Sequence, residues 1–312
     1  MKSNILVTGC GGDIGQSVGK ILNESDFVDT LYGCDISDRN AAKFIFSNFF
    51  VGLPCNDKDY IVNLEKIIEE KKIDIIIPIS EPELRFFSEN NFKDKIGRAK
   101  ILIASSESLR IGFDKLATAN FLEKHQLPFP KTELLNQLVN PAFPLIIKSR
   151  TGSGSKTIHK VDNKEDFNFL VKKQPTFIAQ EYLSDSLGEF TCGLYRSKKG
   201  LMRTIIFKRE LTGGYSGYGE VIENNIITEL LHKLAEKLNL IGSINIQLRI
   251  RGDEPVIFEI NPRFSSTVLF RYLFGFKDLE WSIQDLLDHE IGDYTKAKEG
   301  RMFYKGFKEY ID

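Results

Sequence analysis

The sequence predicts an α/β unit at the N-terminus followed by an α+β unit, and three observations carry this prediction. Short apolar runs alternate with amphipathic stretches over about the first hundred residues, which is typical of a doubly wound parallel sheet. After Ser105 the pattern changes to strand-like runs separated by Gly-rich turns, which favours antiparallel strands mixed with helices. The length of 312 residues is enough for two or three structural units.

The first unit is predicted from short apolar runs that are typical of buried strands. The run at residues 73–79 consists mostly of Ile, as expected for a strand covered on both faces. The expected strands cover residues 4–8, 31–35, 73–79 and 101–104, and the expected helices cover residues 14–22, 59–71 and a segment near Glu83.

The second unit is predicted from shorter runs between polar turns, together with two helices. Lys115 to His125 has a helical pattern that Pro128 and Pro130 end. Residues 225–239 carry apolar side chains at helical spacing and lead into a hairpin. The expected strands cover residues 143–148, 176–183, 189–195 and 201–208, and residues 212–219 are expected to form a Gly/Tyr-rich loop.

The hairpin near the C-terminal end is the most informative segment. Residues 245–250 and 256–263 alternate with period 2 around a five-residue turn that contains Gly252. If Ile250 lies opposite Val256, one face of the hairpin is wholly apolar. That face consists of Ile246, Leu248, Ile250, Val256, Phe258 and Ile260.

The opposite face of this hairpin has the composition of a cation site. Gln247 lies opposite Glu259 in the expected register, and Asn261 follows on the same side. One carboxylate and two amides therefore converge, with Arg263 just beyond them, and hard cations such as Mg²⁺ prefer oxygen ligands of this kind. We predict a metal site at Gln247, Glu259 and Asn261, with an ordinary solvated hairpin face as the alternative.

Composition and charge exclude several classes of function. Lys and Arg total 42 against 43 Asp and Glu, so no net field would attract nucleic acid or an anionic membrane. No apolar run approaches the length of a membrane span or follows the pattern of a signal peptide. The four cysteines lack CxxC spacing and are interpreted as reduced thiols. We therefore expect a cytoplasmic protein.

A Gly-rich turn at residues 9–15 follows the first strand, and Asp35 ends the next strand about twenty residues later. This context fits a dinucleotide fingerprint and allows an NAD-dependent oxidoreductase or epimerase as the alternative function. Such enzymes need a Tyr-xxx-Lys pair after the fourth strand. The pairs that begin at Tyr195 and Tyr304 do not have that setting. We interpret the glycines as serving close helix–strand packing.

Several segments are ambiguous when each is considered by itself. Residues 152–157 resemble the end of a P-loop but lack the Gly before Lys and a following helix, which leaves a phosphate flap or an ordinary loop. Lys148 ends an apolar strand and needs an anion, either a phosphate or a structural carboxylate. Residues 177–183 fit a core strand or an adenine contact. Glu189 fits a ribose contact or an exposed position.

The order of these motifs is more specific than any one of them. Asp114-Lys115 is followed by PLIIK (residues 144–148), the Gly/Ser flap (151–155), QEYL (180–183) and GEFT (188–191). A helix then leads to NIQL (245–248) and FEINPRFSS (258–266). This order resembles the ATP-grasp superfamily, and within it the single-unit ligases similar to one half of the carbamoyl phosphate synthetase large subunit. The resemblance covers nearly the whole chain. It implies a Rossmann-like preATP-grasp domain over residues 1–112, a small lobe over 113–185 and a C-terminal lobe over 186–312.

The resemblance also implies a role for each matching residue. Gln247, Glu259 and Asn261 correspond to the Mg²⁺ (or Mn²⁺) ligands, and Arg263 to the cation that faces the transferred phosphoryl group. The ATP contacts implied by the resemblance are the phosphate-binding Lys115 and Lys148, the flap residues Ser153 and Gly154, the adenine hinge Glu181, Tyr182 and Leu183, and the ribose contact Glu189. Lys208, Arg209 and the loop at residues 213–217 are expected to border the acceptor site, with the loop acting as a lid.

The activity that the resemblance implies is an ATP-dependent carboxylate–amine ligase. A carboxylate would attack ATP to give an acyl phosphate and ADP, and an amine would then displace phosphate to form an amide. Lys148 and the Thr-Gly-Ser-Gly-Ser flap depart from carbamoyl phosphate synthetases, which argues against carbamoyl phosphate chemistry. A nucleotide-binding protein without catalysis is a further alternative, and a homodimer is expected only on general grounds.

Overall fold

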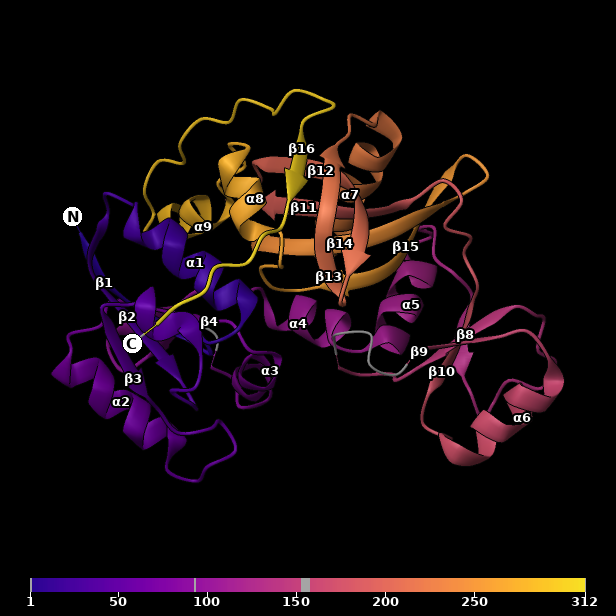
Figure 1. Ribbon diagram of the computed structural model, residues 1–312, viewed down its shortest axis with the longest axis horizontal. Coiled ribbons are helices and arrows are strands. Elements are labelled where there is room, and N and C mark those ends of the chain that lie inside the picture. The colour runs from indigo at the N-terminus through magenta and orange to yellow at the C-terminus, as the bar shows by residue number, and fades with distance from the viewer. Residues whose placement is uncertain (1, 93, 153–157, 312) are drawn as a thin grey trace.

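The computed structural model describes residues 2–92, 94–152 and 158–311, and the described residues form three β-sheets (Figure 1). The first sheet has the order β3-β2-β1-β4-β6-β5. All its neighbouring strands are parallel except for the β5–β6 pair. Its strands are β1 (Ser3–Thr8), β2 (Val28–Asp35), β3 (Asn48–Val51), β4 (Ile75–Pro78), β5 (Lys95–Ile96) and β6 (Ala99–Ile101).

Helices cover both faces of this sheet, which is why its central strands, β1 and β4, are largely apolar and buried. Ile5 and Val7 face one core, whereas Leu6 faces the other. The first unit contains α1 (Asp13–Asn23), η1 (Ala41–Phe44), α2 (Tyr60–Glu70) and α3 (Glu81–Glu89). Two helices from the far end of the chain, α8 (Val268–Leu273) and α9 (Asp278–Leu286), also pack on the α1 side of the sheet.

The second sheet forms a small lobe of antiparallel strands in the order β7-β10-β8-β9. The helix α6 (Lys164–Lys173) packs on one face, where its Phe167 joins a core with Ile147. The strands of this lobe are β7 (Thr132–Leu134), β8 (Leu145–Lys148), β9 (Ile158–Val161) and β10 (Ile178–Glu181).

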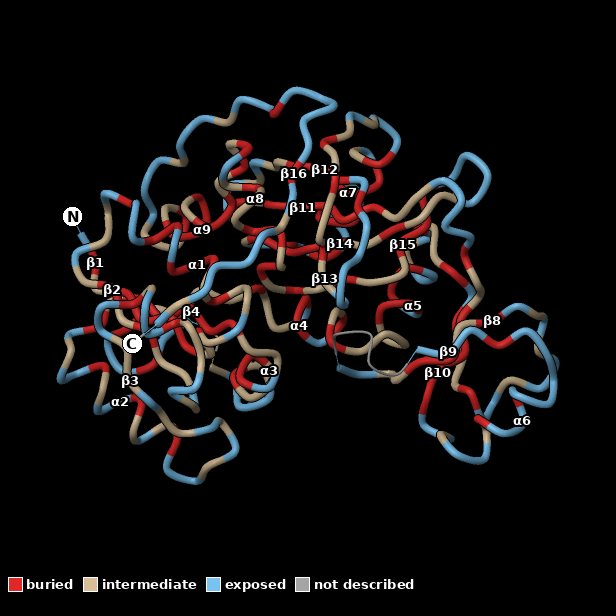
Figure 2. Tube along the Cα trace, viewed as in Figure 1, coloured by how far each residue is buried: buried red, intermediate tan, exposed pale blue. Residues whose placement is uncertain are grey.

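The third sheet is antiparallel with the order β15-β14-β11-β12-β13-β16. A buried core joins this sheet to the helices α4 (Ser106–Gly112), α5 (Lys115–Lys124) and α7 (Asn225–Lys237). Figure 2 shows many buried residues along β11, β14 and α7. The strands are β11 (Glu189–Arg196), β12 (Met202–Thr212), β13 (Tyr215–Val221), β14 (Gly242–Arg251), β15 (Glu254–Asn261) and β16 (Met302–Tyr304).

The three expected segments each carry one sheet, although packing crosses the expected boundaries. The helix α5 falls within residues 113–185, yet its Phe121 and Leu122 join the core of the third sheet. Val268 falls within residues 186–312, yet it packs against the first sheet. The division into three domains stays a prediction. Within the described residues, the helices are too short or too polar to span a bilayer.

Two local predictions are wrong. Residues 212–219 do not form a loop, because β12 and β13 pair as far as Thr212 and Tyr215. Gly213 and Gly214 make the turn, with φ values of 58° and 88° that favour glycine. The turn between β14 and β15 is also shorter than the predicted five residues, since only Gly252 and Asp253 separate the strands.

The β14–β15 register agrees with the prediction at Gln247 and Glu259 but changes beyond them. An irregularity after Gln247 places Leu248 opposite Ile257. As a result Ile257, rather than Phe258, joins the apolar core, and Phe258 lines a cavity instead. A bulge of this kind inserts one residue and turns the following side chains over.

The segment that follows β16, residues 305–311, crosses from the third sheet to the first unit; we call it the C-terminal strap (Figure 1, yellow). The backbone N–H of Lys305 donates to the Gly217 carbonyl at 2.8 Å, and its Nζ forms an ion pair with Asp13. Farther along, the ring of Tyr310 stacks on Phe44 with 5.1 Å between centroids. The strap therefore links the β12–β13 hairpin to α1 and η1.

Candidate functional site

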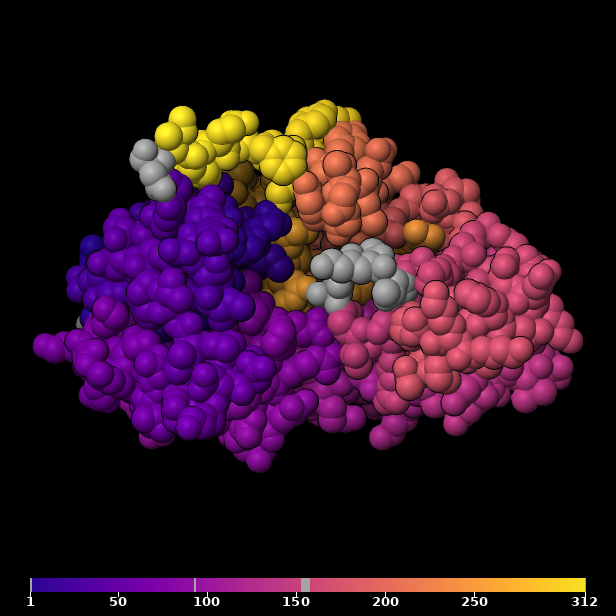
Figure 3. Space-filling model, turned by 60° about the horizontal axis from the view of Figure 1, so that its bottom comes forward, coloured from indigo at the N-terminus to yellow at the C-terminus, as the bar shows by residue number. Residues whose placement is uncertain are grey.

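One cavity of about 1130 Å³ lies between the three sheets. Its walls include Thr8 at the end of β1, Lys148 at the end of β8 and Gln247 on β14. The space-filling view shows the surface hollowed between the first unit and the small lobe (Figure 3). Loop ends and a sheet face thus meet around one space, as in typical small-molecule sites.

The predicted metal-binding face lines this cavity. Gln247 pairs directly with Glu259 across the strands, and Asn245 pairs with Asn261. The Asn261 Nδ2 donates to Glu259 Oε1 at 3.1 Å. One carboxylate with amide oxygens suits a hard cation. No group of three His, Cys, Asp or Glu side chains in the described part of the chain offers another candidate. The residues present therefore fit Mg²⁺, with Glu259 as the single charged ligand.

Lys148 is a buried cation that faces this cavity. Its residue is only 5% exposed, and burial lowers its pKa to about 8, although nearby Glu259 acts in the opposite direction. Its Nζ lies 5.7 Å from the ring centroid of Phe258, the residue that the bulge turns into the cavity. Within the described residues no hydrogen bond or ion pair joins this amino group to the protein. It is therefore placed to receive an anion.

Lys115 lies at the N-terminus of α5, next to the start of the predicted flap. Its Nζ donates to the Gly152 carbonyl at 2.7 Å. Asp114 caps the helix, accepts from the Leu116 and Ala117 N–H groups, and pairs with Arg150 at 2.6 Å. These bonds fix the start of the helix at the cavity wall. The flap residues Ser153 and Gly154 lie outside the described residues.

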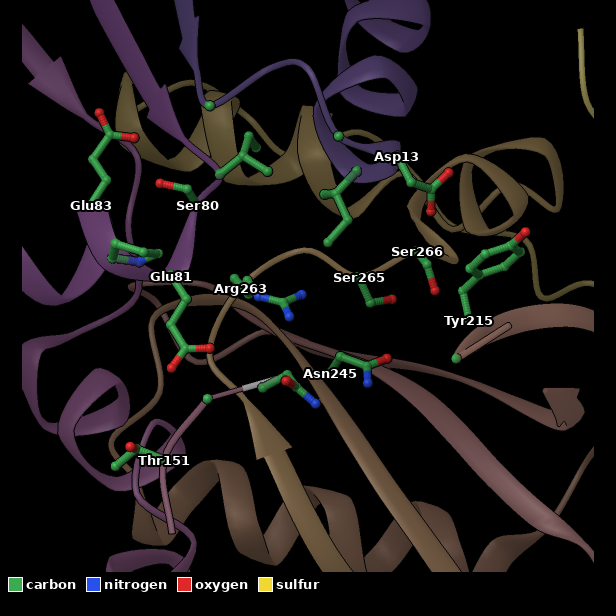
Figure 4. Close-up of a pocket in the computed structure, with 18 of the residues that line it drawn as sticks. Asp13, Ser80, Glu81, Glu83, Thr151, Tyr215, Asn245, Arg263, Ser265 and Ser266 are labelled. Carbon is green, nitrogen blue, oxygen red and sulfur yellow. The ribbon is translucent and has the colours of Figure 1, made fainter. Parts of the chain in front are cut away.

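Arg263 lies in the cavity wall between the first unit and the metal-binding face. Its Nη1 donates to the Phe264 carbonyl at 2.9 Å. Burial lowers its pKa, whereas Glu81 of α3 and Glu259 of β15 raise it. Figure 4 shows Arg263, Glu81 and Asn245 among the side chains of the cavity wall. A guanidinium held between the two parts of the cavity can bind a carboxylate or phosphoryl oxygen there.

The predicted adenine hinge reaches the cavity in part. Glu181 and Leu183 line it, but Tyr182 does not, and its ring lies under Lys160 with 4.8 Å to the centroid. The Glu181 carboxylate pairs with Arg251 at 3.0 Å. Because Tyr182 points elsewhere, only its backbone can contribute to a nucleotide contact.

The predicted ribose contact, Glu189, is held by two arginines. Arg209 pairs with it at 2.6 Å and Arg249 at 2.8 Å, and all three residues line the cavity. Arg209 also donates to Ser216 at 3.1 Å, which ties the β12–β13 hairpin to this group. Lys208, the next residue on β12, is exposed and does not line the cavity. Alternate strand residues face opposite sides, so the structure brings Arg209 to the site and Lys208 away from it.

Sequence reasoning did not identify a role for Asn245. Its Oδ1 accepts from Thr191 Oγ1 at 2.9 Å and from Arg271 Nη2. Both donors occupy the same oxygen, so the Nδ2 hydrogens remain for the cavity that Asn245 lines. Asn245 therefore offers donors rather than a metal-binding oxygen. The Thr191 and Arg271 partners are remote in sequence, so no local pattern could have indicated this orientation.

The Gly-rich turn at residues 9–15 is packed internally. The Gly11 N–H donates to Asp35 Oδ2 at 2.7 Å, and a Cβ on Gly11 would lie 2.7 Å from Asn40 Nδ2. A Cβ on Gly15 would lie 2.5 Å from the Cα of Cys10. Close packing therefore accounts for Gly11 and Gly15, whereas a Cβ on Gly12 would meet nothing within 4 Å. Asp35, the expected ribose ligand of a dinucleotide site, is bonded to the turn itself.

Comparison with known proteins agrees with this geometry. A family model described as an ATP-grasp domain matches residues 113–267. The large chain of carbamoyl phosphate synthase from Archaeoglobus fulgidus is 24% identical over 194 residues, which is 55% of this chain and 18% of that protein. The chain thus spans about a fifth of the length of the curated relatives it matches.

Solved structures share the three-part architecture. An N5-carboxyaminoimidazole ribonucleotide synthetase crystallised with ADP has a TM-score of 0.76 at 16% identity, over 95% of this chain and 80% of that one. An L-amino acid ligase from Bacillus licheniformis has a TM-score of 0.72 at 16% identity, over 91% and 74% of the two chains. The predicted fold is confirmed, and the chain is an ATP-grasp domain protein related to the large chain of carbamoyl phosphate synthase.

Proposed function

We propose that this protein is an ATP-dependent carboxylate–amine ligase that forms an amide through an acyl phosphate and releases ADP and phosphate. The observation that carries the proposal is the placement of Lys148 and Arg263 around the face of Gln247 and Glu259. A buried lysine and a partly buried arginine beside oxygen ligands suit a phosphoryl group that is transferred without a general base. The ADP in a relative of the same fold supports ATP as the nucleotide.

In this proposal the nucleotide contacts come from α5 and from the second and third sheets. Lys115 and Lys148 would hold the phosphates, and the backbone of residues 181–183 would meet the adenine from the end of β10. Glu189 would face the ribose while Arg209 and Arg249 keep its carboxylate in place. Gln247, Glu259 and Asn261 would hold Mg²⁺, or Mn²⁺, which when bound neutralises phosphate charge.

The reaction would proceed in two steps whose atoms balance. A carboxylate oxygen attacks the γ-phosphorus of ATP, the bond to the ADP oxygen breaks, and ADP leaves with that electron pair. The amine nitrogen then attacks the acyl carbon, the bond to the phosphate oxygen breaks, and phosphate leaves. The nitrogen loses its extra proton to solvent. Arg263 and the Nδ2 group of Asn245 would donate to the oxygens on which negative charge collects.

Hydroxylamine trapping tests the proposal without knowledge of the amine. The protein would be incubated with Mg-ATP, hydroxylamine and a panel of carboxylic acids, amino acids and uronic acids, and hydroxamate and ADP would be measured. We expect at least one acid to give both products in equal amounts. The proposal fails if ADP appears without hydroxamate across the panel, or if NAD rather than Mg-ATP stabilises the protein against heat.

The metal-binding face is tested by Glu259→Gln. Loss of the only carboxylate on this face should lower the rate of ADP formation by at least about a hundredfold, while the unfolding transition persists. Asp253→Asn in the β14–β15 turn is the control, because this residue is exposed and does not line the cavity. A Glu259→Gln variant with full activity would remove the metal assignment.

A further inference from the structure

The part of the cavity formed by the first unit differs chemically from the rest; we call the portion lined by residues from Thr8 to Glu83 the N-terminal chamber. Its described lining residues include four carboxyl groups and no Lys, Arg or His. The remaining lining contains the cations that the nucleotide would use. Those cations are Lys115, Lys148, Arg209, Arg249 and Arg263. One continuous cavity therefore has a cationic part and a part without cations.

The walls of the N-terminal chamber are largely apolar. They come from the segment after β3 and from one face of α2, and include Leu53, Pro54, Tyr60, Leu64 and Ile67. Leu53 and Ile67 are only partly buried by the protein, so apolar surface remains for a ligand to cover. Burial of such surface by a ligand favours binding. The chamber thus fits an aliphatic or aromatic body.

The carboxyl groups of the chamber differ in how they are occupied. Asp13 pairs with Lys305, and Glu81 pairs with Arg85 at 2.8 Å. Glu83 accepts from Thr8 at 2.7 Å and also from Tyr60, and burial raises its pKa. A carboxyl group with a raised pKa is less able to hold a permanent negative charge.

Asp35 remains as the carboxylate best placed to bind a cation. It accepts from the Gly11 N–H at 2.7 Å and from the Ser37 N–H at 3.3 Å, and both donors are neutral backbone groups. Within the described residues it has no ion pair. A carboxylate has about four acceptor positions, so these two bonds leave others for a ligand in the chamber.

Charge decides which substrate each part of the cavity can accept. An acid or a phosphorylated compound in the N-terminal chamber would face the Asp35 carboxylate, and the described chamber lining offers no Lys or Arg of its own. Lys305 and Arg85 are already engaged by Asp13 and Glu81. The acid belongs instead at Arg263, on the border of the two parts. An amine arrives as an ammonium ion, which Asp35 can bind. Its nitrogen then gives one proton to solvent, which frees the lone pair that attacks the acyl carbon.

We propose that the N-terminal chamber binds the amine substrate, and that this substrate is an unphosphorylated ammonium compound with an apolar body anchored at Asp35. This assignment rests on the proposed ligase function, because it names the acceptor of that reaction. It gives the Gly-rich turn a role as well, since Gly11 holds the anchoring carboxylate in place.

The binding test uses 2-phenylethylamine and 3-methylbutylamine as probes, titrated by calorimetry into the full chain without ATP. We expect saturable binding of at least one amine and a loss of about tenfold in affinity for Asp35→Asn, because a charged contact becomes neutral. An asparagine can still accept from Gly11, so the turn should persist. Asp38→Asn is the matched control, since this nearby residue is exposed and lies outside the cavity.

A second variant keeps the test decisive if Asp35→Asn unfolds. Leu53→Lys places a cation in the chamber wall on a partly exposed loop and should weaken amine binding about tenfold. The proposal is overturned if neither probe binds, or if both variants retain the wild-type affinity within about twofold. If hydroxamate forms but no amine binds, the chamber assignment fails and the ligase function stands. If an amine binds but no hydroxamate forms, the ligase function fails, and the chamber remains an amine-binding site but not the site of the amine substrate.

Discussion

Lys148 shows how a functional residue can reduce the stability of the protein that carries it. Burial lowers its pKa from 10.5 to about 8. At 1.36 kcal/mol per pKa unit, this corresponds to a cost of roughly 3 kcal/mol for the charged form in the free protein. A bound phosphate would offset that cost by supplying the missing counter-charge.

Lys148→Met should therefore separate stability from function. Removal of the buried charge should raise the melting temperature of the nucleotide-free protein by a few degrees. The same change should weaken ATP binding by at least about tenfold, because a charged contact to phosphate is lost. Calorimetry and thermal unfolding measure both effects. Lys164→Met, on the exposed side of the small lobe, should change neither, and unchanged ATP affinity in Lys148→Met would contradict the assignment.

The lowered pKa of Lys148 also predicts the pH dependence of binding. The folded protein loses this proton above about pH 8, whereas an unfolded chain keeps it up to about 10.5. The unfolded state therefore binds more protons in this interval, and the contribution of Lys148 to the free energy of unfolding rises with pH.

ATP affinity should change in the opposite direction. Phosphate binds the protonated lysine, so affinity should be constant below about pH 8 and fall above it. Calorimetry at pH 8.5 in buffers of different ionisation enthalpy should show that ATP binding takes up protons. This uptake should disappear in Lys148→Met, and an uptake of equal size in that variant would assign it to another group.

At the scale of elements, the β14–β15 hairpin shows where sequence periodicity succeeds and where it fails. The pairing of Gln247 with Glu259 was predictable because polar residues alternate with apolar ones on both strands. The bulge was not, because Val256, Ile257 and Phe258 are all apolar and any of them could face the core. The same limit applies to residues 212–219, where glycines that suggested a loop instead form a tight turn.

The buried pair of Arg271 and Asp278 supports this sheet from behind. Both residues are at most 1% exposed, and their side chains are 3.1 Å apart. Ser243 on β14 donates to the same Asp278 oxygen at 2.6 Å, while Arg271 also donates to Asn245. The orientation of a cavity residue therefore depends on an ion pair between α8 and α9. No local sequence pattern predicts this pair.

Asp278→Asn should be strongly destabilising, because it leaves the buried Arg271 charge without its counter-charge. We expect the free energy of unfolding to fall by about 3–5 kcal/mol, as is usual when one partner of a buried pair is removed. Urea unfolding followed by circular dichroism measures this loss. Glu290→Gln, an exposed change just beyond α9, should stay within about 0.5 kcal/mol of wild type. A comparably small effect of Asp278→Asn would show that the pair does not support the sheet.

At the scale of the whole molecule, the sequence predicted the order of the three sheets but not how they share a cavity. Apolar runs indicate which strands are buried, and the order of motifs around Lys115, Lys148 and Glu259 indicates a nucleotide site. The placement of the cavity's cations outside the N-terminal chamber becomes visible only when residues from distant segments are placed together. The C-terminal strap carried no recognisable pattern, since Lys305 and Tyr310 gain their partners only in the fold.

The strap should contribute local rather than global stability. Lys305→Met removes its ion pair with Asp13 and should accelerate amide hydrogen exchange at residues 305–311 by about three- to tenfold. The global unfolding transition should move little, because most of the strap is exposed. Lys298→Met, on the exposed segment before β16, is the control. Unchanged exchange in Lys305→Met would mean that other contacts hold the strap.

The strap also bears on the order in which substrates bind. It ties the first unit to the third sheet, while α8 and α9 join the same two parts from the other direction. The small lobe is also tied to this body, by the partly exposed ion pairs Arg150–Asp114 and Arg251–Glu181, and its chain connections are residues 125–131 and 182–188. Because partly exposed ion pairs contribute little to stability, relative motion of the small lobe should bend these two connections, beside the nucleotide contacts. The N-terminal chamber would keep its shape whether or not ATP is present, so amine and nucleotide should bind in random order.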